Sequence, residues 1–478
     1  MSDSLKQKTK VGLYWKFAEQ FANYGMQFFI GIILARLLSP SDYGITALPV
    51  IFFCIAYIIA GSSFSTAMIR KPDLKEEDIS TAFYYSTAVG FVFYVILFIA
   101  SPWIADFYEA PVLNPLIRVS ALVFIYSPLG TPQDIILQRR LDFKTPAKIS
   151  VICTVISGTV GITMAYLGYG VWSLTISGMI SGFVGLCMKL SIVRWFPKTG
   201  WSKESFHYLW GFGNKLMSAS LLNTVYENIT PIIIGKFFSL SDLGVYNRAN
   251  NYAKLPSQNA TGVIQSVSFP VLSKIQEDEE SLSNNYRKVL KLSAFVVFPV
   301  MMLLAALAHP LIILMLTKKW EACVILLQIL CFSLMWYPIH AINLNLLQVK
   351  GRSDWFLNLE IIKKIYGIII LAITLPFGLI VFCLGGVFSS FIGLVVNTHY
   401  TGKLINLGFW TQVKDIMPTF FLSLGTFLVS WGTTQMLSSQ WLQLIIGGLL
   451  GIVFYLGVAI FFKMDQLNDV LYMLKRKE

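Results

Sequence analysis

The chain has 478 residues, of which 55% are hydrophobic and only 13% are charged, and its mean hydropathy is +0.66. A soluble globular chain usually carries about twice this share of charged residues, so the composition excludes an ordinary soluble domain and indicates a membrane protein. The formal net charge of +12 would suit a nucleic-acid-binding protein, and the positions of the basic residues decide that question.

Apolar runs of about 20 residues recur along almost the whole chain, and each is long enough to cross a bilayer as an α-helix. In lipid a helix satisfies its own backbone hydrogen bonds. We therefore predict an all-α polytopic membrane protein of about 14 transmembrane helices. The predicted spans are 11–38, 43–69, 79–101, 113–138, 146–167, 171–195, 213–238, 246–272, 288–316, 322–348, 357–376, 379–400, 413–436 and 441–463. The first is long and contains Lys16 and Glu19, so a cleavable signal peptide is not expected.

Lys and Arg residues gather in the two termini and in alternate connections between the predicted spans. These connections are 70–75, 139–148, 189–203, 274–291, 350–352 and 403–414. The opposite loops hold only Lys318 and Lys319. Since cytoplasmic loops are enriched in Lys and Arg, the pattern predicts cytoplasmic N- and C-termini and an even number of spans. The positive charge is then explained by topology and by contact with anionic lipid head groups, and a nucleic-acid partner is not expected.

An internal repeat divides the chain. Residues 31–44 read GIILARLLSPSDYG and residues 231–244 read PIIIGKFFSLSDLG, with six of fourteen positions identical. A Tyr-Ser-Pro sequence in span four and a Tyr-Pro sequence in span ten are a second similarity between the two halves. We predict two parallel six-helix repeats, an arrangement typical of transporters, and two extra C-terminal helices. The predicted domains are an N-terminal lobe (1–197), a cytoplasmic amphipathic linker (198–212), a C-terminal lobe (213–402), and spans 13 and 14 with a cytoplasmic tail (403–478).

Two predicted spans carry polar side chains at helical spacing. On span one they are Lys16, Gln20, Asn23 and Gln27. On span seven they are Ser220, Asn223, Thr224, Glu227 and Thr230. Each set falls on one helical face. Because polar groups are costly inside a membrane, these faces indicate either a water-filled cavity between two lobes or hydrogen bonds between packed helices. We expect the cavity, because the faces lie at equivalent depths of the two repeats.

Ionisable residues inside the spans suggest two roles. Glu227, near the middle of span seven, suits a site for coupling to H⁺ or Na⁺, with a static ion pair as the alternative. Besides Lys16, the cations within the spans are Arg36, Arg118, Lys215, Lys236, Arg248, Lys254, Lys363 and Lys364, and those that face a cavity would bind an anionic head group, especially a pyrophosphate. For Arg36 and Lys236 the alternative is a side chain that extends to the membrane interface. For Lys363 and Lys364, a local ion pair with Glu360 is the simpler interpretation.

Sequence motifs of enzymes and metal sites are missing from the chain. It contains no G-x-S-x-G, H-E-x-x-H or P-loop motif. The six cysteines lie inside predicted spans without a CxxC spacing, and the histidines are scattered, so no disulfide framework or metal site is expected. The outer loops are short and offer little for catalysis. We therefore expect that the protein is not an enzyme and has no cofactor besides a coupling ion.

Several segments resemble bacterial flippases for polysaccharide precursors, within the multidrug/oligosaccharidyl-lipid/polysaccharide exporter superfamily. They are ILARLLSPSDYG (33–44), GSSFSTAMIRK (61–71), QRRLDFK (138–144), YNRANNYAKLP (246–256), VIQSVSFPVLSKIQ (263–276) and LLQVKGRSD (346–354). Their order and spacing are most similar to the colanic-acid and teichuronic-acid exporter branch of lipopolysaccharide biosynthesis proteins. The resemblance implies two lobes that form a V around a cationic central cavity.

The resemblance also implies the activity. An undecaprenyl-pyrophosphate-linked oligosaccharide would be moved by alternating access from the inner to the outer leaflet of the bacterial cytoplasmic (inner) membrane, for cell-surface polysaccharide biosynthesis. In relatives, cations on spans one, two, seven and eight hold the pyrophosphate. The resemblance implies that the matching candidates here are Lys16 and Arg36 on span one, Lys215 and Lys236 on span seven, and Arg248 on span eight. Span two carries no cation before Arg70, which departs from the lipid II flippase pattern and argues against lipid II. Spans 13 and 14 would flank a groove for the isoprenoid tail. A polysaccharide polymerase and a chain-length regulator are further expected partners.

Three alternatives differ in testable ways. A multidrug extruder of the same superfamily usually has twelve spans and a smaller, more acidic cavity, and it would confer drug resistance. A membrane polysaccharide polymerase or glycosyltransferase would need catalytic groups in the outer loops, where Asp106 and Glu109 are almost the only acids. A structural scaffold would tolerate substitutions in the polar faces.

Overall fold

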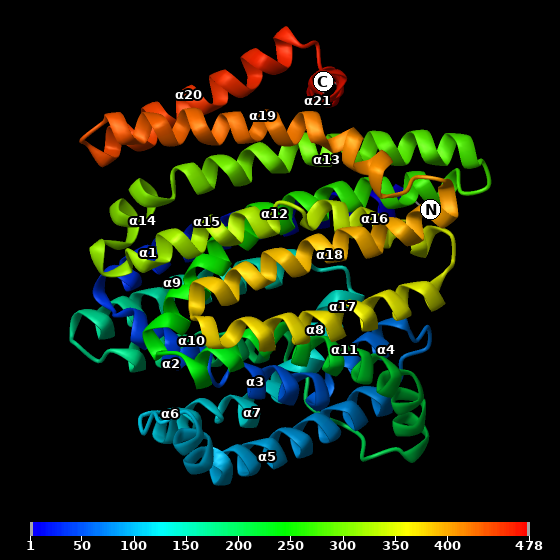
Figure 1. The fold of residues 1–478 in the computed structure, drawn as a ribbon. Coiled ribbons are helices and arrows are strands. Elements are labelled where there is room, and N and C mark those ends of the chain that lie inside the picture. The colour runs from blue at the N-terminus through cyan, green and yellow to red at the C-terminus, as the bar shows by residue number, and fades with distance from the viewer. Residues whose placement is uncertain (1–2, 476–478) are drawn as a thin grey trace. The chain divides into compact units, whose positions relative to one another are not determined.

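The structure, a computed structural model, is helical throughout the part of the chain that it describes. The backbone is described for residues 3–475, and the side chains for residue 15 and for residues 19–61 and 64–470. Within these limits every regular element is an α-, π- or 3-10 helix (Figure 1). The chain divides into two compact units, Met1–Gly244 and Val245–Glu478, and each is described by itself.

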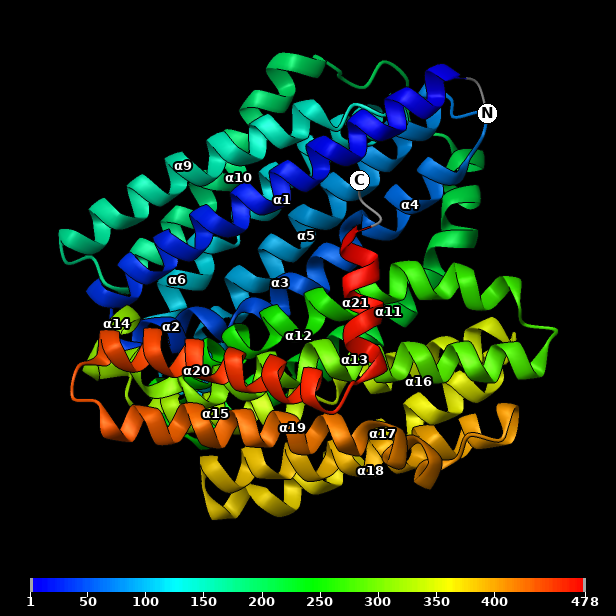
Figure 2. The same ribbon diagram turned by 90° about the horizontal axis from the view of Figure 1, so that it is seen from above.

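The first unit contains the helices that begin before residue 245. They are α1 (Asp3–Leu37), α2 (Pro40–Ala47), α3 (Val50–Tyr57), η1 (Ile58–Ser62), α4 (Ser63–Arg70), α5 (Glu76–Phe107), α6 (Leu113–Ser120), α7 (Val123–Tyr126), η2 (Ser127–Gly130), α8 (Thr131–Arg139), α9 (Lys144–Tyr166), α10 (Val171–Val193), α11 (Lys203–Phe237) and the start of α12 (Leu240–Lys274). Helix α9 packs against both α1 and α10, and the three run side by side in Figure 2. Helix α11 packs against α3, α4 and α5.

The second unit contains most of α12 and the helices that follow it. They are α13 (Glu279–Ala306), α14 (Ala308–Leu316), η3 (Lys318–Trp320), α15 (Ala322–Leu334), α16 (Tyr337–Val349), α17 (Ser353–Thr374), η4 (Leu375–Phe377), α18 (Leu379–Ile405), α19 (Phe409–Met436), α20 (Gln440–Phe461) and α21 (Asp465–Lys475). Helix α19 packs against α13 and α20. Small hydroxyl side chains are buried along it at helical spacing, among them Thr419, Ser423, Thr426 and Ser430. Small residues at such positions let transmembrane helices approach closely.

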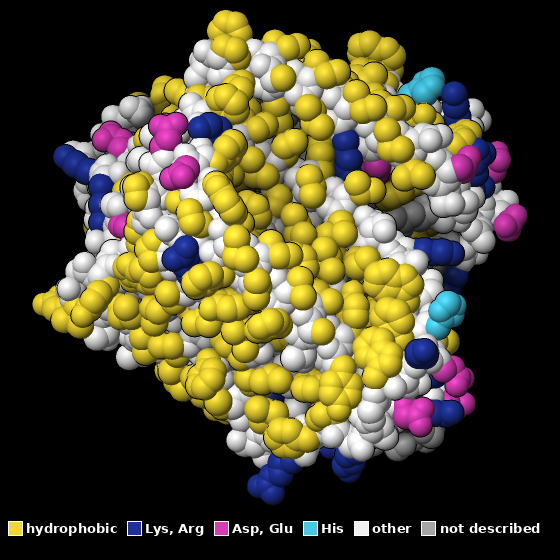
Figure 3. Space-filling view, turned by 90° about the horizontal axis from the view of Figure 1, so that it is seen from below, with side chains coloured by type: hydrophobic (Ala, Val, Ile, Leu, Met, Phe, Trp, Pro, Cys, Tyr) yellow, Lys and Arg dark blue, Asp and Glu magenta, His cyan; other side chains and the backbone are white. Residues whose placement is uncertain are grey.

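The surface and the length of the helices identify a multi-pass membrane protein. Ten helical segments of the described chain are long and apolar enough to cross a membrane. The other four predicted spans coincide with α1, α11, α12 and α17, which carry more polar and charged residues. On α5 the side chains of Phe91, Val92, Ile96 and Ile99 are exposed. Figure 3 shows one face of the molecule with hydrophobic side chains across its middle and charged side chains toward its edges. Such a surface suits lipid contact.

Spans two, four, nine and ten differ from the prediction because they are not single α-helices, and span nine is divided into α13 and α14. Span two contains the π-helical turn η1, in which Gly61 has a φ of +145°. Span four is divided into α6, α7, η2 and α8, and span ten into α15 and α16. Pro128 and Pro338 lie in the first turn after the break in each case. Proline has no backbone N–H to continue the preceding helix, so the duplicated sequence breaks both repeats at the same place.

The repeated S-x-S-D sequence starts a helix in both copies. The Ser39 N–H donates to Asp42 Oδ2 (2.8 Å), and the Asp42 N–H donates to Ser39 Oγ (3.2 Å). Ser239 and Asp242 form the same two hydrogen bonds, at 3.2 and 3.0 Å. This reciprocal cap satisfies N–H groups that the first turn of a helix leaves free.

The glycine that follows each cap lies at a backbone crossing. A Cβ atom on Gly44 would lie 1.8 Å from the carbonyl oxygen of Leu240, and one on Gly244 would lie 1.8 Å from the carbonyl oxygen of Pro40. All four residues belong to the first unit. The starts of α2 and α12 therefore touch at a point where only glycine fits.

In both units, a basic side chain near a helix end forms hydrogen bonds with the backbone of a loop. In the first unit the Arg139 guanidinium donates to the carbonyl oxygens of Lys71 (2.6 Å) and Pro72 (2.9 Å). In the second unit the Lys350 ammonium donates to the carbonyl oxygen of Gln276 (2.7 Å). In each repeat, a cation after the fourth span thus holds the loop between the second and third spans.

The predicted linker, 198–212, is helical in its second part. Helix α11 begins at Lys203, after Ser202, whose Oγ accepts a hydrogen bond from the Ser205 N–H (3.3 Å). It then continues without a break through predicted span seven. The expected interfacial helix and span seven are therefore one element, and the division into lobes at this point stays a prediction.

Candidate functional site

The polar residues of α1 point in different directions. Asn23 is only 8% exposed and contacts α9, where its Nδ2 donates to Ser150 Oγ (2.7 Å) and its Oδ1 accepts from Thr154 Oγ1 (3.0 Å). Gln20 and Gln27 are exposed. Asn23 thus joins two helices, which is the alternative that the sequence analysis left open, whereas no part of the described protein covers the two glutamines.

The polar residues of α11 are more open. Lys215, Asn223 and Glu227 are all exposed. Asn223 Nδ2 donates to Glu227 Oε1 (3.0 Å), so the structure brings two predicted site residues together one helical turn apart. The side chain of Lys16, the fourth predicted member of the face on α1, lies outside the described residues. A role for Glu227 in ion coupling stays a prediction.

The predicted cations near the ends of α1 and α11 differ in their surroundings. Arg36 is exposed. The Lys236 ammonium donates to the carbonyl oxygen of Phe107 (2.7 Å) and lies 3.4 Å from a carboxylate oxygen of Glu109. It also lies 4.9 Å from the centre of the Phe107 ring. Lys236 is therefore held at the end of α5, beside Glu109.

In the second unit, Arg248 lies early in α12 and is half-buried. Its guanidinium carbon lies 5.7 Å from the centre of the Tyr252 ring and 5.9 Å from that of Trp320. Aromatic rings at this distance stabilise a cation that is removed from water. On α17, Lys363 forms an ion pair with Glu360, which confirms the local pairing predicted for it.

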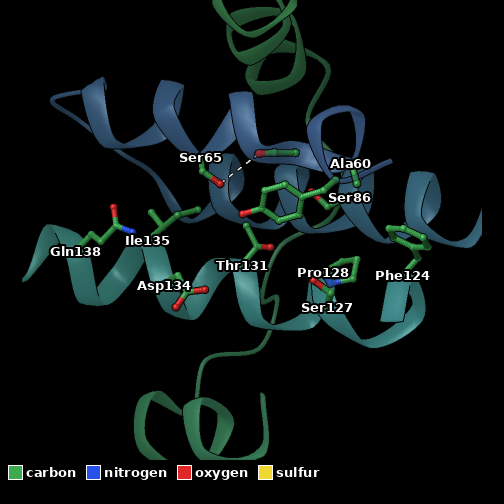
Figure 4. A pocket seen from close by; sticks show the side chains of 12 residues that line it. Ala60, Ser65, Ser86, Phe124, Ser127, Pro128, Thr131, Asp134, Ile135 and Gln138 are labelled. Atoms are coloured by element: carbon green, nitrogen blue, oxygen red, sulfur yellow. Dashed lines mark hydrogen bonds between the residues drawn. The ribbon is translucent and has the colours of Figure 1, made fainter. Parts of the chain in front are cut away.

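A pocket of about 180 Å³ with polar and apolar lining lies inside the first unit, between α5 and the interrupted spans two and four (Figure 4). Hydroxyl and amide groups line much of it, from Tyr57, Ser65, Ser86, Ser127, Thr131 and Gln138. Asp134 on α8 is its charged lining residue, and Asp134 Oδ2 accepts from the Lys189 ammonium of α10 (2.7 Å). The sequence analysis missed this carboxylate, although its position inside predicted span four was a signal that could have found it.

A second group of polar side chains is buried between α16, α18 and α19. The His340 Nδ1 lies 2.9 Å from Asn397 Nδ2. Asn343 Nδ2 donates to Gln412 Oε1 (3.0 Å), and Asn343 Oδ1 accepts from Thr401 Oγ1. These residues contact one another, so they join helices in the way that interhelical hydrogen bonds do. Among the described residues, no three His, Cys, Asp or Glu side chains are grouped to hold a metal ion.

Comparisons of the sequence identify related proteins. The family model described as "Polysaccharide biosynthesis protein" matches residues 33–325. The chain is 24% identical over 382 residues to the teichuronic acid biosynthesis protein TuaB of Bacillus subtilis, covering 79% of each chain. It is also 24% identical over 455 residues to the lipopolysaccharide biosynthesis protein WzxC of Escherichia coli, covering 91% of this chain and 90% of that one. The resemblance to polysaccharide exporters is confirmed.

Solved structures show the same fold. The lipid II flippase MurJ, in an inward closed conformation, matches with a TM-score of 0.75 and 18% identity, over 94% of this chain and 99% of that one. An inward-facing multidrug resistance MATE family transporter of the MOP superfamily matches with a TM-score of 0.58 and 15% identity, over 79% of this chain and 94% of that one. At these identities the likeness concerns the fold and leaves the substrate open.

Proposed function

Since the chain belongs to the polysaccharide biosynthesis protein family, whose relatives are membrane transport proteins and not enzymes, we propose that it is a flippase for lipid-linked oligosaccharides. The proposed substrate is an undecaprenyl-pyrophosphate-linked oligosaccharide. It moves from the cytoplasmic to the periplasmic leaflet of a bacterial cytoplasmic membrane, for O-antigen, capsule or exopolysaccharide synthesis. The observation that carries this proposal is a fold like that of a lipid flippase, in which most long helices are apolar but α1, α11 and α12 carry polar and basic residues.

The proposed mechanism is alternating access. Fourteen spans form two parallel six-helix lobes, residues 1–197 and 213–402, arranged as a V, and residues 403–478 add two helices. The pyrophosphate and the sugars cross in a cavity between the lobes, and the lipid tail stays in the bilayer beside α19 and α20. Both termini are cytoplasmic, which is supported by the basic loops at one end of each unit.

The proposed substrate contacts follow from charge and exposure. Pyrophosphate needs several cations, and the proposed ones include Lys215 and Arg36, which are exposed, and Lys236, which lies beside Glu109. Arg248 and Lys16 complete the proposed set of cations. Exposed amides on α1 and α11 suit sugar hydroxyls, and they belong to Gln20, Gln27 and Asn223.

The test is the leaflet location of the lipid-linked oligosaccharide in cells that lack this gene. A membrane-impermeant sugar-oxidising label is applied to intact spheroplasts. We expect the intermediate to accumulate and to remain protected from the label, because it stays in the inner leaflet. If the accumulated intermediate is labelled from outside, translocation is intact, and a polymerase acting after it becomes the better explanation.

Coupling through Glu227 is tested separately. Glu227→Gln keeps the hydrogen-bonding shape of the side chain and the contact with Asn223 but removes the charge. If this carboxylate binds the coupling ion, the variant loses the response of transport to an ion gradient. Unchanged gradient dependence in Glu227→Gln would remove the coupling role from this residue.

A further inference from the structure

The pocket between α5 and the interrupted spans two and four can hold one small molecule. Its volume of about 180 Å³ corresponds to roughly six water molecules at about 30 Å³ each. Sites for drug-sized ligands usually measure about 300–1,000 Å³, so several linked rings do not fit. All the residues that line the pocket belong to the first unit.

Three hydroxyl groups at the pocket wall are available to a ligand. Ser86 of α5 is only 2% exposed and lines the pocket, yet it forms no hydrogen bond with another described residue. The same is true of Ser127 and Thr131, which line the pocket from span four (Figure 4). Buried polar groups are nearly always hydrogen-bonded, so these hydroxyls indicate a polar occupant.

A carboxylate and an amide lie on α8, one helical turn apart. Asp134 Oδ2 accepts a hydrogen bond from the Lys189 ammonium (2.7 Å), which leaves Oδ1 to accept from a ligand. Gln138 offers both a donor and an acceptor. Two adjacent sugar hydroxyls can donate to such a carboxylate and pair with such an amide. No Lys or Arg is among the described lining residues, so a phosphate is a poor fit.

The remaining lining is apolar and includes two aromatic rings. Phe124 is buried and Tyr57 is exposed, and Ala60, Pro128 and Ile135 complete this part of the wall. A pyranose ring has hydroxyls around its edge and C–H groups on its faces, so it needs polar and apolar contacts at once. The mixed lining therefore fits a pyranose better than a purely polar or a purely apolar molecule.

The backbone of span two leaves space beside Ser86. In the π-helical turn η1, Gly61 has a φ of +145°, which disfavours any residue with a side chain. A Cβ atom there would lie 2.5 Å from Ser86 Oγ and would fill the space that a ligand hydroxyl needs. Isolated π-helical turns are frequent at functional sites.

The position of the pocket suits a substrate that enters from the cytoplasm. Its residues lie toward the ends of spans two and four that carry Arg70 and Arg139, and the proposed topology puts these ends on the cytoplasmic side. Helix α11, with exposed Lys215 and Asn223, packs against α3 and η1, which form one wall of the pocket. The pocket is thus next to a helix that carries part of the proposed substrate contacts.

We infer that this pocket binds one pyranose unit of the transported oligosaccharide, an assignment that rests on the proposed flippase function. Asp134 and Gln138 bind adjacent sugar hydroxyls, Ser86 and Thr131 bind others, and the aromatic rings contact the C–H face. No covalent bond changes. A sugar whose hydroxyls point elsewhere leaves polar groups of the pocket unpaired, so the pocket selects among sugars by the orientation of their hydroxyl groups.

The first experiment measures binding without transport. The reporter is Ala60→Cys, which puts a thiol at the pocket wall and keeps every polar lining group. Purified full-length protein is treated with a small methanethiosulfonate reagent, and mass spectrometry follows the modification at position 60. The competitors are the monosaccharides released by acid hydrolysis of the cells' own surface polysaccharide, with the acyclic polyol sorbitol for comparison.

At least one of these monosaccharides should slow the modification about tenfold, because an occupied pocket excludes the reagent, and sorbitol should not. The control is Asn284→Cys, at an exposed position of α13, which every competitor should leave unaffected. If the thiol at position 60 is never modified, if no monosaccharide slows its modification, or if sorbitol protects it equally, the sugar site is refuted.

The second experiment removes single polar groups of the pocket. In the Ala60→Cys protein, Ser86→Ala should raise the sugar concentration needed for half-protection about fivefold, and Asp134→Asn about tenfold, because hydrogen bonds to a charged group are stronger. The control Thr159→Val, on α9, removes a hydroxyl that donates within its own helix and should change nothing. Equal protection in Ser86→Ala, Asp134→Asn and Thr159→Val would refute the assignment. Ser86→Ala covers the case in which Asp134→Asn does not fold.

The binding assay and the leaflet assay fail independently. If the lipid-linked oligosaccharide is trapped in the inner leaflet of cells without this gene but no sugar protects position 60, the flippase stands and the sugar site falls. If a sugar protects position 60 but the intermediate is labelled from outside in those cells, the proposed function falls and the sugar site stands.

Discussion

Replacing Gly44 by alanine should force two backbones apart. The new Cβ would lie 1.8 Å from the Leu240 carbonyl oxygen and 3.2 Å from the Gly244 nitrogen. An ordinary contact needs about 2 Å more, and since the opposing atoms are backbone, no side-chain rotation can provide it. The starts of α2 and α12 have to separate, at an expected cost of about 3 kcal/mol, the upper end for overpacked sites.

The measurement is the free energy of unfolding of the purified protein in mixed micelles. Gly178→Ala, on α10, is the matched control, because nothing lies within 4 Å of its added Cβ. Gly244→Ala should cost about as much as Gly44→Ala, since its Cβ would lie 1.8 Å from the Pro40 carbonyl oxygen. One separation relieves both clashes, so the double variant should cost clearly less than the sum of the two. Additive effects, or single effects no larger than that of Gly178→Ala, would refute the reasoning.

Three further predictions concern interhelical contacts and a helix start. Asn23→Leu removes two hydrogen bonds between α1 and α9 and should lower the unfolding free energy by about 1 kcal/mol; an unchanged value contradicts it. Asp415→Asn removes the carboxylate that pairs with the Arg287 guanidinium, and the side chains of Asp415 and Arg287 are 6% and 39% exposed. We expect the unfolding free energy to fall by about 2 kcal/mol, and an unchanged value would contradict this prediction. Hydrogen bonds from the Ser281 hydroxyl and N–H hold the pKa of Asp278 below its usual range, so the cap of α13 persists at neutral pH and is lost as acidification passes the lowered pKa. After correction for the intrinsic pH dependence of amide exchange, the protection at the start of α13 should fall in acid for the wild type, while in Asp278→Asn it should not depend on pH in this range.

The positions of the helices were accessible from the sequence, because an apolar segment that crosses a bilayer has a length fixed by the membrane. Predicted span 441–463, for example, corresponds to α20 at Gln440–Phe461, and span 146–167 to α9 at Lys144–Tyr166. The breaks within single spans were harder to predict from the sequence. Prolines mark the breaks in spans four and ten, whereas the π-helical turn at Gly61 has no comparable sequence signal.

The candidate site was predicted less completely, because helical periodicity defines a face but not what covers it. Asn23 and Asn223 occupy equivalent positions of the repeat, yet the first is buried against α9 and the second is exposed. The pairing of Lys236 with Glu109 depends on how α5 ends beside α11, which no local pattern contains. Asp134 lies inside predicted span four, but its partner Lys189 is 55 residues away in the sequence, so only the structure shows that the two side chains pair.

The reciprocal Ser–Asp caps and the loops that Arg139 and Lys350 bind have a consequence for how proteins of this family are classified. The first S-x-S-D sequence and the segments around Arg139 and Lys350 are among those that resemble the exporter family, and the structure assigns each of them to a helix start or a loop attachment. A signature built on these residues therefore sorts chains by architecture. Two proteins that share the signature are free to export different polysaccharides, and the residues that distinguish their cargo are to be sought outside it.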